Sequence, residues 1–267
     1  MTNKKDYIII LHVTVPIKKY YGKKKEVKKK LRLKLKFELK KNEIPRDYRP
    51  FILSFIKHSV SSYDQTLYRS LYESGAIPKR YTFSVWLDTP SFQSELIQIC
   101  NNRMDIQFST SDTVLGIHIY NAFLKMRMKD FSIPLNNVLL LKQIQLIPEK
   151  IITGKKILAQ FISPLVVRSH TQDKDFYYSI ANSEFNKELM KILRYQLEIL
   201  NDLPLSLLED FHMTPVKPQK TVVQFYGQYI EATLGTFEME GDPILLDYFY
   251  KQGLGSKRSC GYGMIVV

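Results

Sequence analysis

A glycine-rich segment with two adjacent cations lies close to the C-terminus. Residues 253–263 read Gly-Leu-Gly-Ser-Lys-Arg-Ser-Cys-Gly-Tyr-Gly and hold four of the chain's 11 glycines. Glycines let a backbone approach a ligand closely, and consecutive N–H groups can cradle a phosphate. A helix cap and a tight turn explain only one or two of the glycines. The segment therefore favours phosphate binding, and its candidate contacts are Gly253, Gly255, Ser256, Lys257, Arg258, Gly261 and Gly263.

Other phosphate-binding loops fit this segment poorly. A P-loop requires Gly-x4-Gly-Lys followed by Ser or Thr, which the chain lacks. A dinucleotide-binding loop follows a strand and opens a helix, whereas this segment follows a predicted helix and precedes a predicted strand. The sequence therefore does not indicate a nucleotide-hydrolysing or dinucleotide-binding protein.

Metal, redox and membrane functions have little support. The two cysteines, Cys100 and Cys260, form no metal or redox motif. We see no His, Cys and Asp cluster at ligand spacing, so we expect no metal and no cofactor. No stretch of about 18 apolar residues occurs, and we expect neither a membrane span nor a secretory signal. A reduced, cytoplasmic setting fits this cysteine usage.

The positive charge is concentrated at the N-terminus. The formal net charge is +13, which suggests a polyanionic partner. Residues 1–41 hold 15 Lys and Arg against 3 acidic residues, and the other 226 residues hold 24 against 23. The lysine run at 18–30 fits a solvated tail as well as it fits contact with RNA.

The elements that must position these residues form a repeated pattern. Residues 31–39 alternate apolar and polar side chains, which predicts a half-buried strand. Helical spacing predicts helices over 46–61, 64–74, 112–128, 184–201 and 242–253. The predicted strands are 81–87, 104–110, 138–147, 157–167, 221–226, 229–237 and 262–267, and the hairpin of the two near 227 turns at Gly227-Gln228.

This order gives two β-α-β-β-α-β units, with one extra helix in the first. The sequence therefore predicts an α+β fold of tandem ferredoxin-like domains. We expect a basic extension over 1–30, an N-terminal domain over 31–148, and a C-terminal domain over 149–267 that carries the glycine-rich segment.

The glycine pattern adds a resemblance to a known family. Gly-x-Gly-x5-Gly-x-Gly between the last helix and last strand resembles the signature loop of the RAMP superfamily, and within it the endoribonucleases that process CRISPR repeat RNA. The glycine loop is the most specific part of a resemblance that covers 31–267. Supporting segments are Ser163–Arg168, Val222–Phe237, Glu240–Pro243, Asp47–Arg49 with Phe55-Ile56, and Lys79–Ser84.

Residues 1–30 depart from the family pattern. They are a basic arm, or they reflect a start upstream of the true one, with Val27 as an alternative initiation position.

The resemblance implies metal-independent cleavage of the CRISPR repeat transcript into guide RNAs. In that reaction the ribose 2′-hydroxyl attacks the adjacent phosphate and leaves a 2′,3′-cyclic phosphate. Such chemistry needs a base, an acid and a cation for the phosphorane charge. The implied partners are repeat RNA, as a stem-loop or a single strand, and a CRISPR effector complex.

The resemblance also implies where catalytic groups stand. The usual histidine follows a Leu at the end of the short second helix, and Tyr72 stands there in this chain. His58, three residues after Phe55 on the first helix, is our substitute as base or acid. Lys79 matches the lysine at the start of the next strand. The candidate catalytic residues are therefore His58, Lys79 and Tyr72, with Tyr68 assisting.

Arg168 is a further candidate RNA contact, because the charged segment 168–176 is expected to be exposed. His170, two residues later, stays open. His118 is interpreted as structural, His212 falls in a proline-flanked linker, and His12 falls in the N-terminal extension.

Two functions remain open and a third fits poorly. The first is the endoribonuclease, and the second is a repeat-RNA-binding protein without cleavage, which Tyr72 in the histidine position favours. The third is an RNA binder of the RRM kind, but its aromatic motif, Lys/Arg-Gly-Phe/Tyr-Gly/Ala-Phe-Val, is absent.

Overall fold

The computed structural model describes residues 31–171 and 174–267. The expected basic extension over 1–30, with its lysine run and His12, lies outside the described residues. Within the described ranges, no helix is long and apolar enough to cross a membrane.

The N-terminal half is built on a five-stranded antiparallel sheet. Its order is β3-β6-β1-β8-β7. The alternation of residues 31–39 places Leu33 and Leu35 in the core, where they pair with Phe108 and Ile106 of β6. The strands are β1 (Leu31–Leu39), β3 (Tyr81–Leu87), β6 (Arg103–Thr110), β7 (Asp130–Ile133) and β8 (Asn137–Ile147).

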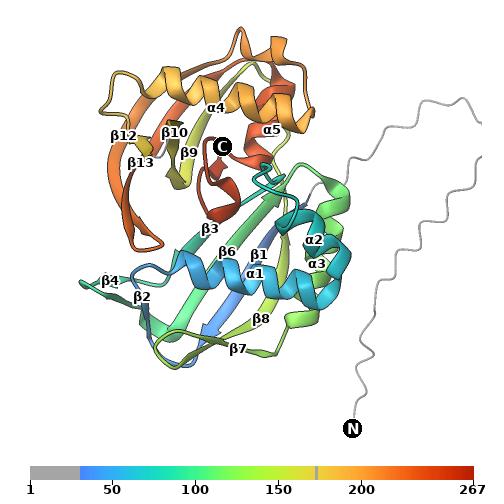
Figure 1. The fold of residues 1–267 in the computed structure, drawn as a ribbon, viewed down its shortest axis with the longest axis vertical. Helices are drawn as coiled ribbons and strands as arrows, with labels where there is room; N and C mark the ends of the chain where they lie inside the picture. Colours follow the sequence, from blue (N-terminus) through green and yellow to red (C-terminus); the bar gives the residue numbers. More distant parts are fainter. Residues whose placement is uncertain (1–30, 172–173) are drawn as a thin grey trace, which may run out of the picture.

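Helices α1 (Arg49–Tyr63) and α3 (Thr113–Met126) cover one face of this sheet (Figure 1). Asp112 caps α3 by accepting a hydrogen bond from the backbone N–H of Leu115 at 3.0 Å. The short helix α2 (Gln65–Tyr72) follows α1 directly, and Asp64 accepts hydrogen bonds from its first turn. Phe55 of α1 packs among aromatic rings from the sheet and from α3.

The C-terminal half repeats the arrangement with a four-stranded antiparallel sheet. Its order is β12-β13-β9-β14. The elements are β9 (Lys156–Leu165), α4 (Phe185–Leu200), β12 (His212–Phe225), β13 (Gln228–Glu240), α5 (Pro243–Gln252) and β14 (Ile265–Val266). Asp242 caps α5, whose first residue is a proline, as the sequence predicts.

Both sheets have the strand order of the ferredoxin-like fold. When the four main strands of each half are numbered along the chain, both sheets read 2-3-1-4. The predicted α+β fold of two ferredoxin-like units is therefore confirmed. The change from one sheet to the other falls between Ile147 and Lys156, and we propose the domain boundary there.

The structure adds elements that the sequence did not predict. The charged segment after Arg168 is a hairpin of β10 (Val167–Thr171) and β11 (Lys174–Tyr178). The chain turns at Tyr226-Gly227, one residue before the predicted turn, and β12 starts at His212, so that residue is in a strand rather than a linker. A small sheet joins β2 (Glu43–Pro45), β5 (Leu96–Gln98) and β4 (Ser91–Phe92), and three short 3₁₀ turns are η1 (Cys100–Asn102), η2 (Leu205–Leu208) and η3 (Arg258–Cys260).

The carboxylate of Asp202 is one of the contacts that link the two halves. Asp202, just after α4, accepts a hydrogen bond from Arg80 Nε at 2.9 Å across the interface. It also accepts hydrogen bonds from the Tyr248 hydroxyl at 3.1 Å and from Gln252 Nε2 at 3.2 Å. Gln252 also donates to Ser111 of the N-terminal half at 2.6 Å. Asp202 thus organises donors from both halves.

We predict that Asp202→Asn lowers the free energy of unfolding. Hydrogen bonds to charged groups contribute about 1.5–3 kcal/mol, so a loss of that order is expected. Urea denaturation measures it, with Asp210→Asn as the control, because Asp210 is exposed and makes no side-chain contact within the described ranges. Equal losses in both variants would show that Asp202 does not stabilise the interface.

Candidate functional site

Two of the loop glycines allow the ends of the glycine-rich segment to lie backbone against backbone. The Leu254 N–H donates to the Gly263 carbonyl at 2.9 Å, and the Gly263 N–H donates to the Pro164 carbonyl at 2.8 Å. Gly263 has φ +70°, and a Cβ there would lie 1.8 Å from the Leu254 carbonyl oxygen. Gly253 has φ +73°, and a Cβ there would lie 2.6 Å from the Gly263 carbonyl oxygen. Any side chain at either position is excluded.

The other two glycines leave room for neighbouring parts of the protein to pack closely against the loop. A Cβ at Gly255 would lie 2.5 Å from the Val166 carbonyl oxygen, and one at Gly261 would lie 2.6 Å from the Phe83 ring. The structure thus gives all four glycines a packing role. Direct contact of these glycines with a ligand stays a prediction.

The loop leaves three backbone donors unused. Within residues 31–171 and 174–267, no hydrogen bond is made by the N–H groups of Lys257, Arg258 and Ser259. Lys257 has left-handed backbone geometry at φ +57°. Successive N–H groups in such a turn form an anion-binding concavity, so the middle of the loop is suited to hold a phosphate oxygen.

Arg258 points away from that concavity. Its residue is only 4 % exposed, and its Nη1 donates to the Gly253 carbonyl at 3.4 Å. Burial lowers the pKa of Arg258, and the neighbouring Tyr248 and Asp202 raise it. One guanidinium nitrogen is therefore used inside the C-terminal half, and RNA contact by the Arg258 side chain stays a prediction.

Three lysines from three segments meet at the loop. Lys57 of α1 and Lys79, before β3, lie over the Tyr72 ring at 5.4 and 5.5 Å from its centroid. Lys257 lies over the Phe225 ring at 5.1 Å. None of the three forms an ion pair with another described residue. We call Lys57, Lys79 and Lys257 the lysine cluster.

Burial shapes the electrostatics of the cluster. It lowers the pKa of Lys79 and of Lys257, in each case with a further contribution from a neighbouring cation. The Cys260 thiol lies among the lysines: burial raises its pKa, and the three ammonium groups act in the opposite direction. Cations that are partly desolvated and unpaired favour a bound anion.

Tyr72 is the aromatic platform of the cluster. Its hydroxyl lies 3.0 Å from that of Tyr81, and Tyr68 packs against its ring at 5.2 Å. Burial raises the pKa of Tyr72 to about 12, although the hydrogen bond with Tyr81 opposes this. At neutral pH Tyr72 therefore stays protonated and can donate a hydrogen bond, but it cannot serve as a base.

His58 lies elsewhere. Its ring is 5.6 Å from the Phe131 ring of β7, the edge strand opposite β3, and its Nε2 is 3.4 Å from Ser62 Oγ. The expectation relied on Phe55 facing a cleft, but Phe55 is fully buried in the core. The structure brings Lys79 and Tyr72 together and does not bring His58 to them.

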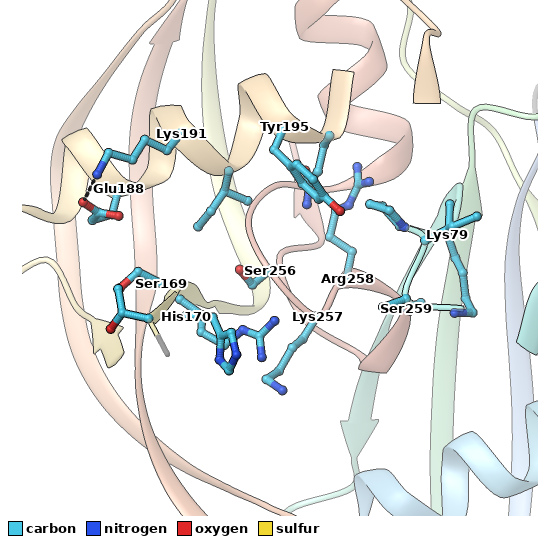
Figure 2. Close-up of a pocket in the computed structure, with 17 residues that line it drawn as sticks. Lys79, Ser169, His170, Glu188, Lys191, Tyr195, Ser256, Lys257, Arg258 and Ser259 are labelled. Carbon is cyan, nitrogen blue, oxygen red and sulfur yellow. Dashed lines mark hydrogen bonds and ion pairs between the residues drawn. The ribbon is translucent and has the colours of Figure 1, made fainter. Parts of the chain in front are cut away.

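Two members of the lysine cluster, Lys79 and Lys257, line an open cleft of about 580 Å³ between the two halves. Figure 2 shows its walls: α4 with Tyr195 and Lys191 on one side, Lys79 on another, and the loop with Ser256 to Ser259 below. The cleft is therefore shared by both halves of the chain.

The β10–β11 hairpin supplies Arg168 and His170 to this cleft. His170 Nδ1 lies 2.8 Å from Asp175 Oδ1, and Arg168 Nη1 lies 3.0 Å from Asp175 Oδ2. Partial burial acts to raise the pKa of Asp175, but the hydrogen bonds from His170 and Arg168 outweigh it and lower the pKa to about 2. Among the described residues, no group of three or more His, Cys, Asp and Glu is placed to hold a metal ion.

The comparisons with known proteins agree with this architecture. Residues 147–267 match the family described as "CRISPR associated protein Cas6, C-terminal". The C-terminal half is thus similar to the C-terminal part of Cas6 proteins. A search of curated proteins found no significant match.

Solved structures extend the likeness of the fold beyond this C-terminal half. A Cas6-related protein from Pyrococcus furiosus aligns with a TM-score of 0.76 and 23% identity, over 89% of this chain and 98% of that one. A RAMP protein described as binding different RNA substrates aligns with a TM-score of 0.74 and 23% identity, over 88% and 98%. A CRISPR associated protein Cas6 aligns with a TM-score of 0.71 and 18% identity, over 88% and 98%. At these identities the likeness establishes the fold alone.

Sequence reasoning missed Lys57 as a member of the cluster. Its only signal was its position beside His58, and helix phase decided between the two neighbours. Residues one apart on a helix point about 100° apart, so Lys57 faces Tyr72 while His58 faces Phe131.

We predict an acid-dependent contribution from Asp175. Its folded pKa of about 2 lies below its ordinary value of 3.8, so its stabilisation is complete above about pH 4 and is lost as pH falls toward 2. Wild type should have a larger free energy of unfolding than Asp175→Asn at pH 5, and this difference should shrink below pH 4. Asp130→Asn, an exposed carboxylate, is the control. An equal difference at pH 5 and pH 2.5 would contradict the assignment.

Proposed function

We propose that the chain binds CRISPR repeat RNA in the cleft and cleaves it at a phosphate held by the lysine cluster. The observation that carries this proposal is the meeting of three unpaired lysines around the free N–H groups of the loop. The similarity of its C-terminal half to Cas6 proteins supports the choice of RNA. The name of one structural relative, a RAMP protein binding different RNA substrates, agrees with that choice.

The proposed reaction is attack of the ribose 2′-oxygen on the adjacent phosphorus. The new bond joins the 2′-oxygen to phosphorus, the bond from phosphorus to the 5′-oxygen breaks, and the products are a 2′,3′-cyclic phosphate and a 5′-hydroxyl. Lys79 and Lys257 stabilise the negative charge of the phosphorane. This route uses no metal ion.

Two protons move in this step, and we assign one group to each. His170 lines the cleft, and Asp175 holds its Nδ1. That contact leaves Nε2 to take the proton of the 2′-hydroxyl. The Tyr72 hydroxyl, which burial keeps protonated, donates to the leaving 5′-oxygen. Base and acid thus come from different halves of the chain.

A second candidate function is repeat-RNA binding without cleavage. The observation that favours it is Tyr72 itself. A phenol with a pKa of about 12 is a weaker proton donor at neutral pH than the histidine that the family resemblance implies at this position. Binding would use the same lysine cluster, so only a cleavage assay separates the two functions.

We predict that replacing Lys57, Lys79 and Lys257 by Gln weakens repeat-RNA binding and flattens its salt dependence. On single strands, log Kobs changes with log salt by about −0.7 per contacted phosphate. Fluorescence anisotropy from 50 to 300 mM KCl measures both quantities. The matched control replaces Lys40, Lys129 and Lys155, which are exposed, unpaired and outside the cleft lining. Equal slopes in the two triple variants would remove the lysine cluster from the RNA site.

We predict that wild type cleaves the repeat RNA of its own genome in EDTA, and that His170→Ala slows cleavage by about 10²–10⁴-fold at retained affinity. His58→Ala should cleave like wild type, because its ring lies over β7. Single-turnover gel assays give the rates, and phosphatase treatment identifies the cyclic phosphate. Tight binding without cleavage by wild type would favour the second candidate function.

A further inference from the structure

The α4 wall of the cleft carries an aromatic side chain that has no role in the lysine cluster. Tyr195 is 51 % exposed. Within the part of the chain that the structure describes, its side chain makes no hydrogen bond and no ring contact. Figure 2 shows it reaching from α4 toward the loop that carries Arg258. A large ring held at the wall of a cleft without a partner is available to a ligand.

A second apolar side chain lines the same cleft from the other half. Ile77, in the segment between α2 and β3, is also 51 % exposed. Single exposed apolar residues are ordinary on protein surfaces. These two, however, come from different halves and line one cavity, together with Pro78 and the partly buried Ile192. The cleft therefore offers apolar contacts to a flat group that enters between its walls.

Positive charge lies next to these apolar contacts. Lys79 follows Ile77 and Pro78 directly, and Lys257 lies on the loop below. The one acidic residue of the described lining, Glu188, is paired with Lys191 at 2.7 Å. An aromatic face beside unpaired cations matches a nucleotide, which has a planar base attached to an anionic phosphate. An apolar peptide would leave those cations unused.

We propose that this part of the cleft is a nucleobase subsite, in which one unpaired base of the bound RNA stacks on the Tyr195 ring and packs against Ile77. The phosphate of that nucleotide lies toward Lys79 and Lys257, so the subsite sets which nucleotide stands beside the scissile phosphate. This inference rests on the proposed RNA-binding function. A cavity of about 580 Å³ has room for a nucleotide.

The subsite selects for an unpaired base rather than for one base type. Every base has a face that can stack, so stacking tolerates any sequence. Gln196 also lines the cleft, but its Nε2 donates to the Gly255 carbonyl at 2.8 Å and so is already used. We therefore expect the register of the RNA to be set by where the strand is unpaired.

The test is an abasic scan of the repeat RNA against wild type, Tyr195→Ala and Tyr195→Phe. In wild type, removing the base at one position should weaken binding by about 5- to 150-fold, the range for loss of one base–aromatic stack. Tyr195→Ala should weaken binding of the intact RNA by a similar factor. Removing the base at that position should then cause no further loss of affinity. Tyr195→Phe should bind like wild type, because the stacking face is kept. Ile199→Ala, one turn along α4 and outside the cleft lining, should leave the scan unchanged.

The outcomes separate this subsite from the function it rests on. An unchanged abasic profile in Tyr195→Ala, with repeat RNA still bound, would overturn the subsite and leave RNA binding intact. A failure of wild type to bind repeat RNA would overturn both. If Tyr195→Phe lost as much affinity as Tyr195→Ala, a hydroxyl contact would replace stacking and the subsite as proposed would fall.

Discussion

The carboxylate of Asp202 is the contact on which the geometry of the cleft depends. It lies between the halves and accepts from Arg80, the residue that follows Lys79. On the other side it accepts from Tyr248 and lies close enough to act on Arg258, the residue that follows Lys257. Lys79 and Lys257 are thus each joined by one peptide bond to an arginine in the surroundings of the same carboxylate. The arginines are used to fix the structure, and this leaves the lysines free for a ligand.

Aromatic rings, rather than acidic side chains, hold the lysine cluster. An acidic partner would fix a lysine equally well, but it would compete with phosphate for the same ammonium group. Cation–π contacts contribute only about 0.5–1 kcal/mol at exposed sites, so a phosphate displaces them at little cost. Tyr72 and Phe225 therefore position the lysines and leave their charge available. Arg168 differs, because a phosphate must compete there with Asp175.

The helices and strands could be predicted from the sequence better than the residues of the candidate site. Strand β1 and the caps of α3 and α5 follow from local patterns, because alternation and capping act over a few residues. Which of Lys57 and His58 faces Tyr72 depends on how helix α1 is rotated against the rest of the fold. The helical spacing around Phe55 did not determine that rotation. Lys257 and Arg258 are adjacent cations, yet their side chains point in different directions, because the left-handed backbone at Lys257 turns the chain between them. That turn lies between Gly255 and Gly261, which pack against Val166 and Phe83, so it depends on contacts that a local pattern does not reveal.

In the proposed reaction the proton-transfer groups lie in different halves of the chain, and this has a consequence for how cleavage would be controlled. His170 belongs to a hairpin of the Cas6-type half, whereas Tyr72 and Lys79 belong to the first half. Cleavage by this arrangement requires both halves to hold their separation, whereas binding needs only enough cations to meet the backbone of the RNA. In-line attack loses rate steeply with small displacements. A weakened interface would therefore cost cleavage before it costs affinity.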